Sequence, residues 1–353
     1  MGYRYIGSKE KLASLIISYI KQICPDANSV IDLMAGTGLF SLALRKAGYR
    51  VIASDVMTYS LHHLRVLLTL EDSPSFDNVK INGKKNKNGY EGVIEFLNNI
   101  TPKNGFFARE YGEGGTPKEC GHSRLYFSRE NARKIDAIRE TIMDWNEQGM
   151  LSEIEHSLLL HDLIMAVNDV ANIAGTYGHY LSHFVARALT PIKLHPYVFR
   201  EKGNFKRHKV IQGYAETVSK GMKADVCYID PPYIKRQYAA NYHILETIAK
   251  EDYPDAIGDS GLRPWRNQYS NFCSKRLIRD SFAEIFKNLK CEHIFVSYSE
   301  DGLLSLDEMK ALFEQFGAVT VKEIEYKRFK SNDSKKGSLL KEYIIYIHKQ
   351  ELK

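Results

Sequence analysis

The stretch SVIDLMAGTGLFSLALRKAGYRVIASD, residues 29–55, decides the fold class of this chain. Its mostly apolar run at 30–33 predicts a short buried strand, and Gly-Thr-Gly at 36–38 predicts a tight turn. Residues 39–47 predict a helix, and a second apolar strand follows and ends at Asp55. A strand, a turn, a helix and a strand in this order form a βαβ unit, which usually opens a parallel sheet covered by helices.

The same alternation of strands and helices returns in the second half of the chain, from residue 205 onward. At its end, residues 319–329 and 341–349 alternate between apolar and polar side chains like an antiparallel hairpin. We therefore predict an α/β fold with a doubly wound, mostly parallel sheet and a C-terminal antiparallel hairpin.

The middle of the chain, residues 61–204, loses this rhythm and carries long helical patterns at 131–147 and 152–174. We interpret it as an inserted, partly helical module. The predicted domains are one discontinuous domain at 1–60 and 205–353 and the insertion between its two parts.

The glycine turn lies where doubly wound sheets bind nucleotide-like ligands at a helix N-terminus. Asp32 precedes the turn, and Asp55, at the end of the second strand, can accept hydrogen bonds from ribose hydroxyls. Ser41 stands where the dinucleotide fingerprint requires a third glycine, so a cofactor with ribose but no pyrophosphate fits better than NAD. S-adenosylmethionine is such a cofactor. An ordinary βα turn without a ligand is the alternative.

The strand ADVCYID at 224–230 is followed by two prolines and a tyrosine, and proline cannot continue a sheet ladder. An exocyclic amine on a base is a poor nucleophile because its lone pair is delocalised into the ring. The carboxylate of Asp230 and the carbonyl of Pro231, oriented by Pro232, can accept its two N–H bonds and favour a pyramidal, nucleophilic nitrogen. Tyr233 offers a flat face for a base taken out of its stack. A strand that needs a hard stop is the alternative.

Three motifs and their order resemble one known family. Asp-Pro-Pro-Tyr at 230–233 is similar to the catalytic motif of the amino-methyltransferases of DNA, and especially of the adenine-specific methyltransferases of the D12 class. DLMAGTG at 32–38 is similar to the glycine motif of that family, and RYIGSK at 4–9 to its N-terminal motif. The order of N-terminal motif, glycine motif, insertion and catalytic motif is the alpha arrangement, which implies that the insertion is a target-recognition domain.

The resemblance implies a cofactor and a reaction. It implies that S-adenosylmethionine binds at Tyr5, Lys9, Asp32, Ala35, Gly36, Gly38, Asp55 and Asp230. It implies catalysis by Asp230, Pro231, Pro232 and Tyr233. The implied reaction is methyl transfer to N6 of adenine in double-stranded DNA by base flipping. Its implied role is protection of host DNA in a restriction–modification system, which allows a cognate restriction endonuclease as a partner.

RQYAANYH at 236–243 and NIAGTYGHYL at 172–181 also resemble blocks of one adenine-methylase branch. Four residues either contact the substrate or pack the start of a helix: Arg236, Tyr238, Asn241 and Tyr242. His243 is expected to be a packed histidine, because this reaction needs no general base. Five residues of the insertion either face DNA or, for the aromatic ones, pack its core: Phe106, Phe107, Tyr111, Arg124 and Arg129.

Charge and cysteine content set further bounds. The net charge of +6 and the basic runs at 82–90, 200–209 and 327–341 favour a polyanionic partner. The five cysteines form no Cys-x-x-Cys pair, and Cys120 with His122 supplies only two ligands, so we predict no metal site and no disulfide framework. The chain shows no signal-peptide core and no apolar stretch of membrane-spanning length, which predicts a cytoplasmic protein without a membrane partner.

Two other functions stay open. An amino-methyltransferase acting on N4 of cytosine or on structured RNA would share the motif at 230–233, although the large insertion favours recognition of a DNA sequence. A catalytically silent DNA-binding protein could keep the same fold. The intact catalytic and glycine motifs argue against this second alternative, and detectable turnover would exclude it.

Overall fold

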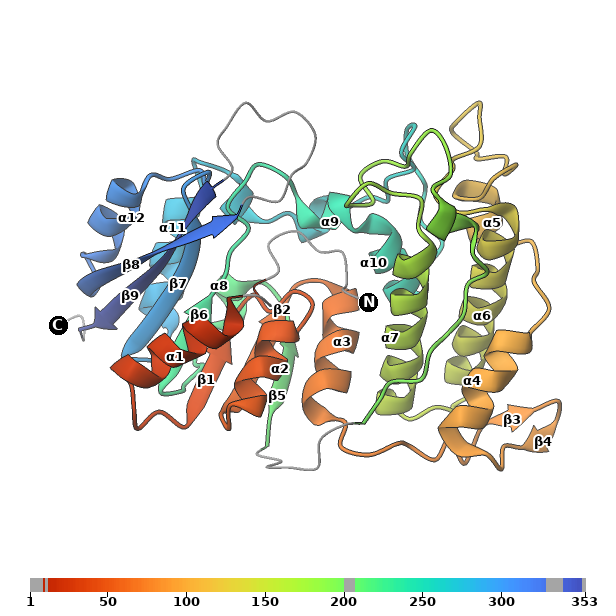
Figure 1. Ribbon diagram of the computed structural model, residues 1–353, viewed down its shortest axis with the longest axis horizontal. Coiled ribbons are helices and arrows are strands. Elements are labelled where there is room, and N and C mark those ends of the chain that lie inside the picture. The colour runs from red at the N-terminus through yellow and green to blue at the C-terminus, as the bar shows by residue number, and fades with distance from the viewer. Residues whose placement is uncertain (1–8, 10–11, 200–206, 328–338, 351–353) are drawn as a thin grey trace. The chain divides into compact units, whose positions relative to one another are not determined.

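The chain forms two compact units, which a computed structural model describes over residues 9, 12–199, 207–327 and 339–350 (Figure 1). The sheet unit comprises residues 9, 12–56, 207–237, 270–327 and 339–350. The helical unit comprises residues 57–199 and 238–269.

The sheet unit is built on a seven-stranded sheet with the strand order β5-β2-β1-β6-β7-β9-β8. Its strands are β1 (Ser29–Asp32), β2 (Arg50–Asp55), β5 (Lys209–Gln212), β6 (Val226–Ile229), β7 (His293–Ser299), β8 (Gly317–Lys327) and β9 (Leu339–Lys349). The strands from β5 to β7 are parallel, and β9 is antiparallel to both β7 and β8. A mostly parallel sheet with a C-terminal antiparallel hairpin is therefore confirmed, and it fits a methyltransferase fold.

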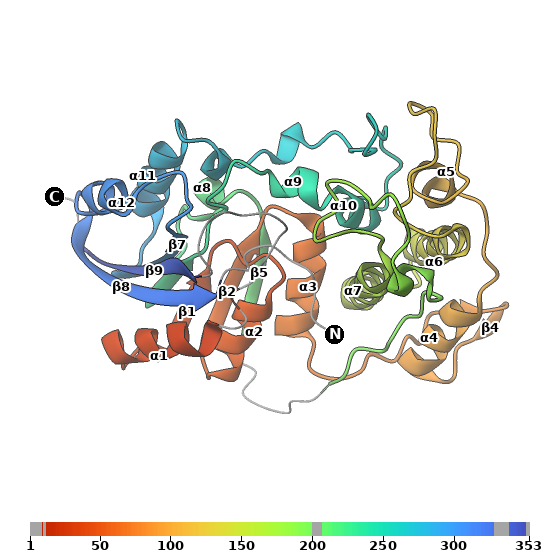
Figure 2. The same ribbon diagram turned by 45° about the horizontal axis from the view of Figure 1, so that its top comes forward.

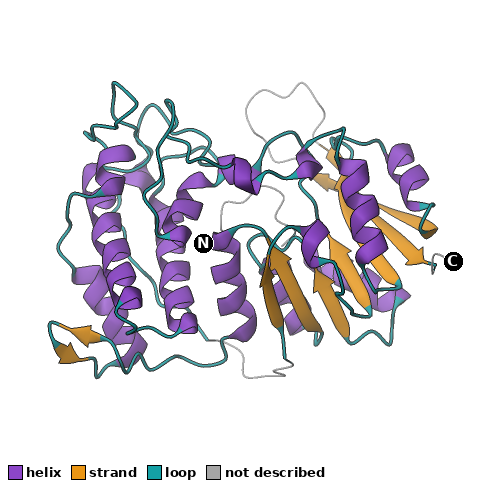
Figure 3. Cartoon of the chain, turned by 180° about the vertical axis from the view of Figure 1, so that it is seen from behind, coloured by secondary structure: helices purple, strands orange, loops and turns teal. Residues whose placement is uncertain are grey.

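Helices cover both faces of this sheet. α1 (Ala13–Ile23) and α2 (Leu39–Lys46) lie on the face turned toward the viewer in Figure 1. α8 (Ala215–Val218), α11 (Ile278–Asn288) and α12 (Leu306–Phe313) lie on the opposite face, seen in Figure 3. Side chains of β6 alternate between these layers. Ile229 packs in one apolar cluster with Phe282 of α11, whereas the Tyr228 ring lies 4.2 Å from that of Phe40 in α2, measured between ring centroids.

The helical unit is packed around α7 (Glu153–Val170). This helix contacts α3 (Thr58–Thr69), α6 (Arg129–Glu147) and α10 (His243–Lys250), and Figure 2 shows α6 and α7 side by side, nearly end-on. The other described elements are α4 (Gly89–Asn99), α5 (Phe106–Glu110), α9 (Tyr238–Asn241) and the short hairpin of β3 (Lys80–Ile81) and β4 (Lys84–Lys85). α7 begins at a capping box, in which Ser152 and Glu155 each accept the backbone N–H of the other.

Residues 238–269 group with the helical unit, although we assigned them to the discontinuous domain. α10 of this segment packs against α3 and α7, and two buried arginines also bind the segment. Arg124 donates to the carbonyl of Ala256 (2.9 Å), and Arg139 donates to that of Asp252 (2.6 Å). A buried guanidinium needs acceptors for its many donors, so these contacts tie the later segment to the insertion.

Several helices coincide with their predicted ranges. The helix predicted at 39–47 is α2, and those predicted at 131–147 and 152–174 are α6 and α7, although α7 ends at Val170. We did not predict α3, which buries residues around most of its circumference and therefore has no clear polar face. Among the described residues, no helix is both long enough and apolar enough to cross a membrane.

Candidate active site

The turn between β1 and α2 has a backbone that glycine adopts readily and other residues do not. Gly36 and Gly38 have φ angles of 54° and 78°, in the left-handed region. The Ala35 N–H donates to the Ser54 carbonyl (2.9 Å), and the Gly38 N–H donates to the Ala35 carbonyl (2.9 Å). The turn therefore holds the first N–H groups of α2 at the carboxyl edge of the sheet, where such groups can meet a ligand.

Asp55 reaches this turn from the end of β2. Its Oδ2 accepts a 2.8 Å hydrogen bond from the Gly36 N–H, and the side chain is half-buried. The acid predicted to contact the cofactor ribose thus lies directly against the glycine turn. Its contact with a ribose stays a prediction.

Asp32 is buried beneath the turn. Its Oδ2 accepts a 2.6 Å hydrogen bond from Ser41 Oγ, which joins β1 to α2. Burial raises the pKa of Asp32 to about 7, the Ser41 hydrogen bond opposes the rise, and the charges of Asp230 and Asp55 add to it. Ser41, which stands in place of a third glycine, therefore has its own partner in the fold.

Asp230 directly follows β6, the strand between β1 and β7 in the sheet. The Lys9 Nζ lies 3.0 Å from Asp230 Oδ1 and 2.8 Å from Glu342 Oε1. The side chains of Lys9 and Glu342 are 5% and 6% exposed, whereas that of Asp230 is 18% exposed. Lys9 thus bridges two carboxylates, and Asp230 is the member of this triad most open to a substrate.

The charges of this triad depend on one another. Burial raises the pKa of Asp230 to about 6, the Lys9 charge opposes the rise, and the Glu342 charge adds to it. Burial disfavours the charged form of Lys9, but the carboxylates of Asp230 and Glu342 outweigh it and hold the pKa of Lys9 well above its usual value. At neutral pH the lysine is therefore charged, and Asp230 is mainly a carboxylate.

Tyr233, the last residue of the motif, contacts the end of β7 and the segment that follows it. Its carbonyl accepts a 3.0 Å hydrogen bond from the Leu303 N–H, and its ring meets that of Tyr298 edge to face at 5.8 Å between centroids. The Lys9 Nζ lies 5.4 Å from the Tyr233 ring centroid. Burial raises the pKa of Tyr233 to about 12, so the ring is neutral at pH 7.

Residues 230–233 and the glycine turn share one edge of the sheet. β6 pairs with β1, and in this register Tyr228 lies opposite Asp32. The two loops therefore leave neighbouring parallel strands at their carboxyl ends, the edge where ligands of such sheets bind. Tyr5 lies outside the described residues.

Glu342 is the member of the triad that sequence reasoning missed. It lies in β9, 112 positions after Asp230, and it opposes Ser299 at the end of β7. The available signal was one acid inside the apolar strand KEYIIYIHK, since a buried acid requires a partner. Its partner could not be identified before the strand order was known.

The four predicted substrate residues lie in different surroundings. Arg236 belongs to the sheet unit, and its side chain is exposed. Tyr238 and Asn241 are half-buried in the helical unit. Tyr242 is fully buried there, with its ring 6.0 Å from that of Tyr59 between centroids, so the packing alternative accounts for it.

The two sequence blocks of the predicted methylase branch meet within the helical unit. The Tyr177 N–H donates to the Asn241 carbonyl (2.8 Å). The Nε2 atom of His243 lies 2.9 Å from the Tyr177 carbonyl oxygen. Burial lowers the pKa of His243 to about 3, which fits a packed, neutral histidine.

Most of the insertion residues that were expected to pack or to face DNA are buried. Phe106, Phe107, Tyr111 and Arg124 are all buried, whereas Arg129 is exposed. For these three aromatic residues, core packing is therefore the observed arrangement.

Comparisons with known proteins agree with this geometry. The model of the family described as D12 class N6 adenine-specific DNA methyltransferase matches residues 5–324. The chain is 35% identical to the Type II methyltransferase M.FokI of Planomicrobium okeanokoites, over 98% of this chain and 52% of that protein. It is 32% identical to the Type II methyltransferase M.NlaIII of Neisseria lactamica, over 98% of this chain and 99% of that protein. It is 31% identical to the Type II methyltransferase M.CviAII of Paramecium bursaria Chlorella virus 1, over 98% of each.

The chain thus spans about half the length of the M.FokI relative but nearly all of the other two. The range matched by the family model includes the glycine turn, residues 61–204 and the motif at 230–233.

Proposed function

Because the chain belongs to the D12 class N6 adenine-specific DNA methyltransferase family, we propose that it methylates N6 of adenine in double-stranded DNA and uses S-adenosylmethionine as the donor. The observation that carries this proposal is the position of Asp230. Its carboxylate, held by Lys9, lies at the sheet edge that also carries the glycine turn.

The glycine turn suits the cofactor. The left-handed glycines at 36 and 38 leave no side chain over the start of α2, and Asp55 lies against the turn. In our proposal the backbone of Ala35, Gly36 and Gly38 lines the cofactor site, Asp55 accepts the ribose hydroxyls, and the buried Asp32 supports the turn. Bound S-adenosylmethionine would supply an activated methyl group on a sulfonium.

The motif at 230–233 would hold the target amine. Asp230 accepts one N–H of the adenine amino group, and the Pro231 carbonyl accepts the other. Pro232 limits the directions that this carbonyl can take, and the Tyr233 ring stacks on the base taken out of the helix. Two acceptors favour a pyramidal nitrogen with an available lone pair. Methyl transfer would form the N–C bond, break the S–C bond of the donor and release its thioether, and the methylated nitrogen would then lose one proton to water.

Lys9 and Glu342 would act on Asp230 without touching the base. The positive charge of Lys9 stabilises the carboxylate form of Asp230 and fixes its Oδ1, which leaves Oδ2 for the amine. Glu342 in turn holds Lys9 from the other side. We assign both as positioning residues, and Lys9, with Tyr5, also as part of the cofactor site.

The helical unit would recognise the target sequence. Its exposed residues, together with Arg236, Tyr238 and Asn241, are the proposed DNA contacts, whereas Tyr242 would support them from the interior. The names of the relatives support a place in a restriction–modification system, in which methylation protects host DNA and a cognate endonuclease is the partner.

Nucleoside mass spectrometry tests the proposal. DNA and RNA are incubated with the protein and S-adenosylmethionine, digested, and analysed beside the Asp230→Ala variant and a Glu284→Gln control, in which an exposed acid of α11 is changed. We expect N6-methyldeoxyadenosine from DNA with the wild type and the control, and none with Asp230→Ala.

The other products separate the alternatives. N4-methyldeoxycytidine or a methylated ribonucleoside would retain the chemistry but overturn the substrate. If neither nucleic acid is methylated although DNA binds, the catalytically silent DNA-binding protein becomes the better account.

A further inference from the structure

We propose that Cys120, His122 and Asp259 bind one Zn²⁺ ion in the helical unit. This site shares no residue with the proposed methyl-transfer site and does not depend on the proposed function. Cys120 and His122 alone gave no reason to predict a metal, because two ligands are too few. The fold adds a third ligand from 137 positions further along the chain.

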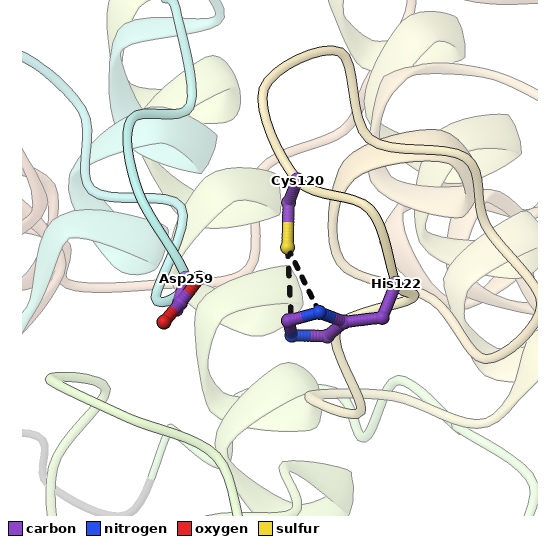
Figure 4. Close-up of side chains that lie close together, drawn as sticks. All are labelled: Cys120, His122 and Asp259. Atoms are coloured by element: carbon purple, nitrogen blue, oxygen red, sulfur yellow. Dashed lines mark hydrogen bonds between the residues drawn. The ribbon is translucent and has the colours of Figure 1, made fainter.

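The geometry of the three side chains fits a single ion. The Cys120 Sγ lies 3.5 Å from His122 Nδ1 and 3.4 Å from Nε2. The sulfur, a ring nitrogen and an Asp259 carboxylate oxygen all lie within 4.8 Å of one another. Two ligands of one tetrahedral zinc, with bonds of about 2.0–2.3 Å, are separated by roughly 3.5 Å. Figure 4 shows the sulfur directed at the imidazole, and Asp259 on a separate loop that faces them.

A partner of His122 orients the ring for metal binding. The His122 Nε2 lies 3.1 Å from the Tyr180 hydroxyl. When Nε2–H donates to this hydroxyl, Nδ1 carries the lone pair, and Nδ1 is the atom that binds the ion. Metal-bound histidines commonly donate their other ring N–H to an oxygen in this way.

Backbone hydrogen bonds hold the loop that carries Asp259, so the position of its backbone does not depend on a bound ion. Ile257 and Leu262 exchange backbone hydrogen bonds (2.9 Å each), which closes a tight hairpin with Asp259 at its tip. Gly258 and Gly261 in this hairpin have φ angles of 67° and 63°.

Arg124 fastens this hairpin to the loop that carries the other two ligands. It lies two positions after His122, and its side chain is fully buried. It donates to the carbonyls of Gly258 (2.8 Å) and Asp259 (3.2 Å). The Tyr126 hydroxyl also donates to the Ser260 carbonyl (2.9 Å). The same contacts that build the helical unit therefore bring the third ligand to the first two.

The donor set favours zinc over the abundant cations Mg²⁺ and Ca²⁺. A thiolate, an imidazole and a carboxylate are all zinc ligands, whereas Mg²⁺ and Ca²⁺ prefer sites made of oxygen alone. Cys120 is partly exposed and His122 and Asp259 are exposed, so the ion can enter from solvent, and water can take the fourth position. Bound zinc would join the glycine-rich loop at 112–123 to the hairpin at 257–262.

Titration of the metal-free full chain with ZnCl₂ tests the proposal. Isothermal titration calorimetry should show one zinc per chain for the wild type and no heat with MgCl₂. Changing a residue that only hydrogen-bonds to a metal ligand typically lowers metal affinity by roughly 10–100-fold. We expect at least this loss of zinc affinity when a ligand itself is changed, in the variants Cys120→Ser, His122→Ala and Asp259→Asn. His195→Ala and Asp255→Asn, exposed groups of the same types in the same unit, should bind zinc like the wild type.

Cobalt spectroscopy distinguishes this site from chance binding to histidines. The Co²⁺ form of the wild type should show a sulfur-to-metal charge-transfer band, and Cys120→Ser should lose it. Circular dichroism of the metal-free variants checks folding, and the exposed Asp259→Asn provides a test that disturbs no packed residue. A wild type that binds no zinc, or ligand variants that bind it as tightly as the wild type, would overturn the proposal.

Discussion

Lys9 explains how the mostly buried carboxylate of Asp230 can stay ionised in this site. Burial favours the neutral form of Asp230, and the nearby Glu342 carboxylate favours it further. The Lys9 ammonium, 3.0 Å from Asp230 and 2.8 Å from Glu342, opposes both effects, so the pKa of Asp230 rises only to about 6. A protonated acid has lost its negative charge, and one of its two acceptor oxygens has become a donor. The charge balance of the three residues therefore determines how well Asp230 can hold the amine.

This balance predicts opposite pH shifts for two variants. The pKa of Asp230 is about 6, so kcat/KM should fall as the pH decreases through about 6. Glu342→Gln removes a negative charge that raises this pKa, so the acid limb should move to lower pH. Lys9→Gln removes the opposing positive charge, so the limb should move to higher pH.

Profiles of kcat/KM between pH 5 and pH 8 measure both shifts, with Lys287→Gln as a control that changes an exposed lysine of α11. Limbs that move in the same direction, or that stay at the wild-type position in both variants, would show that Asp230 is not the titrating group.

At the scale of elements, sequence predicts what is local. The order of β1, glycine turn, α2 and β2 follows from apolar runs and glycines within 27 residues, and the end of β6 follows from Asp-Pro-Pro-Tyr. The contact of Glu342 with Lys9 depends on the position of β9 beside β7, which no short-range pattern encodes. The buried side chain of Tyr242 likewise depends on contacts with α3, which was not predicted.

The segment after β7 should be sensitive to a single methyl group. A Cβ at Gly302 would lie 2.1 Å from Tyr298 Cε1, in a buried ring that packs against Tyr233. Gly302→Ala should therefore lower the free energy of unfolding by about 1–3 kcal/mol, the usual cost of overpacking, and should also lower kcat/KM by moving Tyr233. Gly175→Ala, where a Cβ meets no atom within 4 Å, is the matched control. Thermal unfolding gives the comparison, and equal stability of the two variants would contradict the packing argument.

At the scale of the whole molecule, the strand rhythm is lost at 61–204, which includes most of the first segment of the helical unit, but this pattern did not predict the second segment. Residues 238–269 follow the catalytic motif in sequence and yet pack with the helical unit. Buried Arg124 and Arg139 bind that segment from more than 100 positions away. Contacts between residues so far apart in the sequence leave no pattern in any short stretch of it. For the same reason, the third proposed zinc ligand, Asp259, could not be found from the sequence.

The net charge of +6 leads to a prediction about DNA affinity. Lys84, Lys85 and Lys87 are exposed in the basic run at 82–90. If they contact phosphates, changing all three to Gln should weaken binding to any duplex and reduce the slope of log K against log salt by about one per lost contact. Lys220, Lys287 and Lys290, also exposed, form the matched triple control. Fluorescence anisotropy measures both slopes. If the slope of log K against log salt is the same for the two triple variants, the run at 82–90 does not contact DNA phosphates.

The role of Asp230 is tested most directly by the single-turnover rate of methyl transfer by Asp230→Ala, with DNA and S-adenosylmethionine both at saturating concentrations. We expect a loss of at least about 10²–10³-fold, because one of two preorganised acceptors is removed, with DNA affinity unchanged and the Glu284→Gln control at the wild-type rate. If the variant transfers methyl groups as fast as the wild type, Asp230 does not hold the target amine.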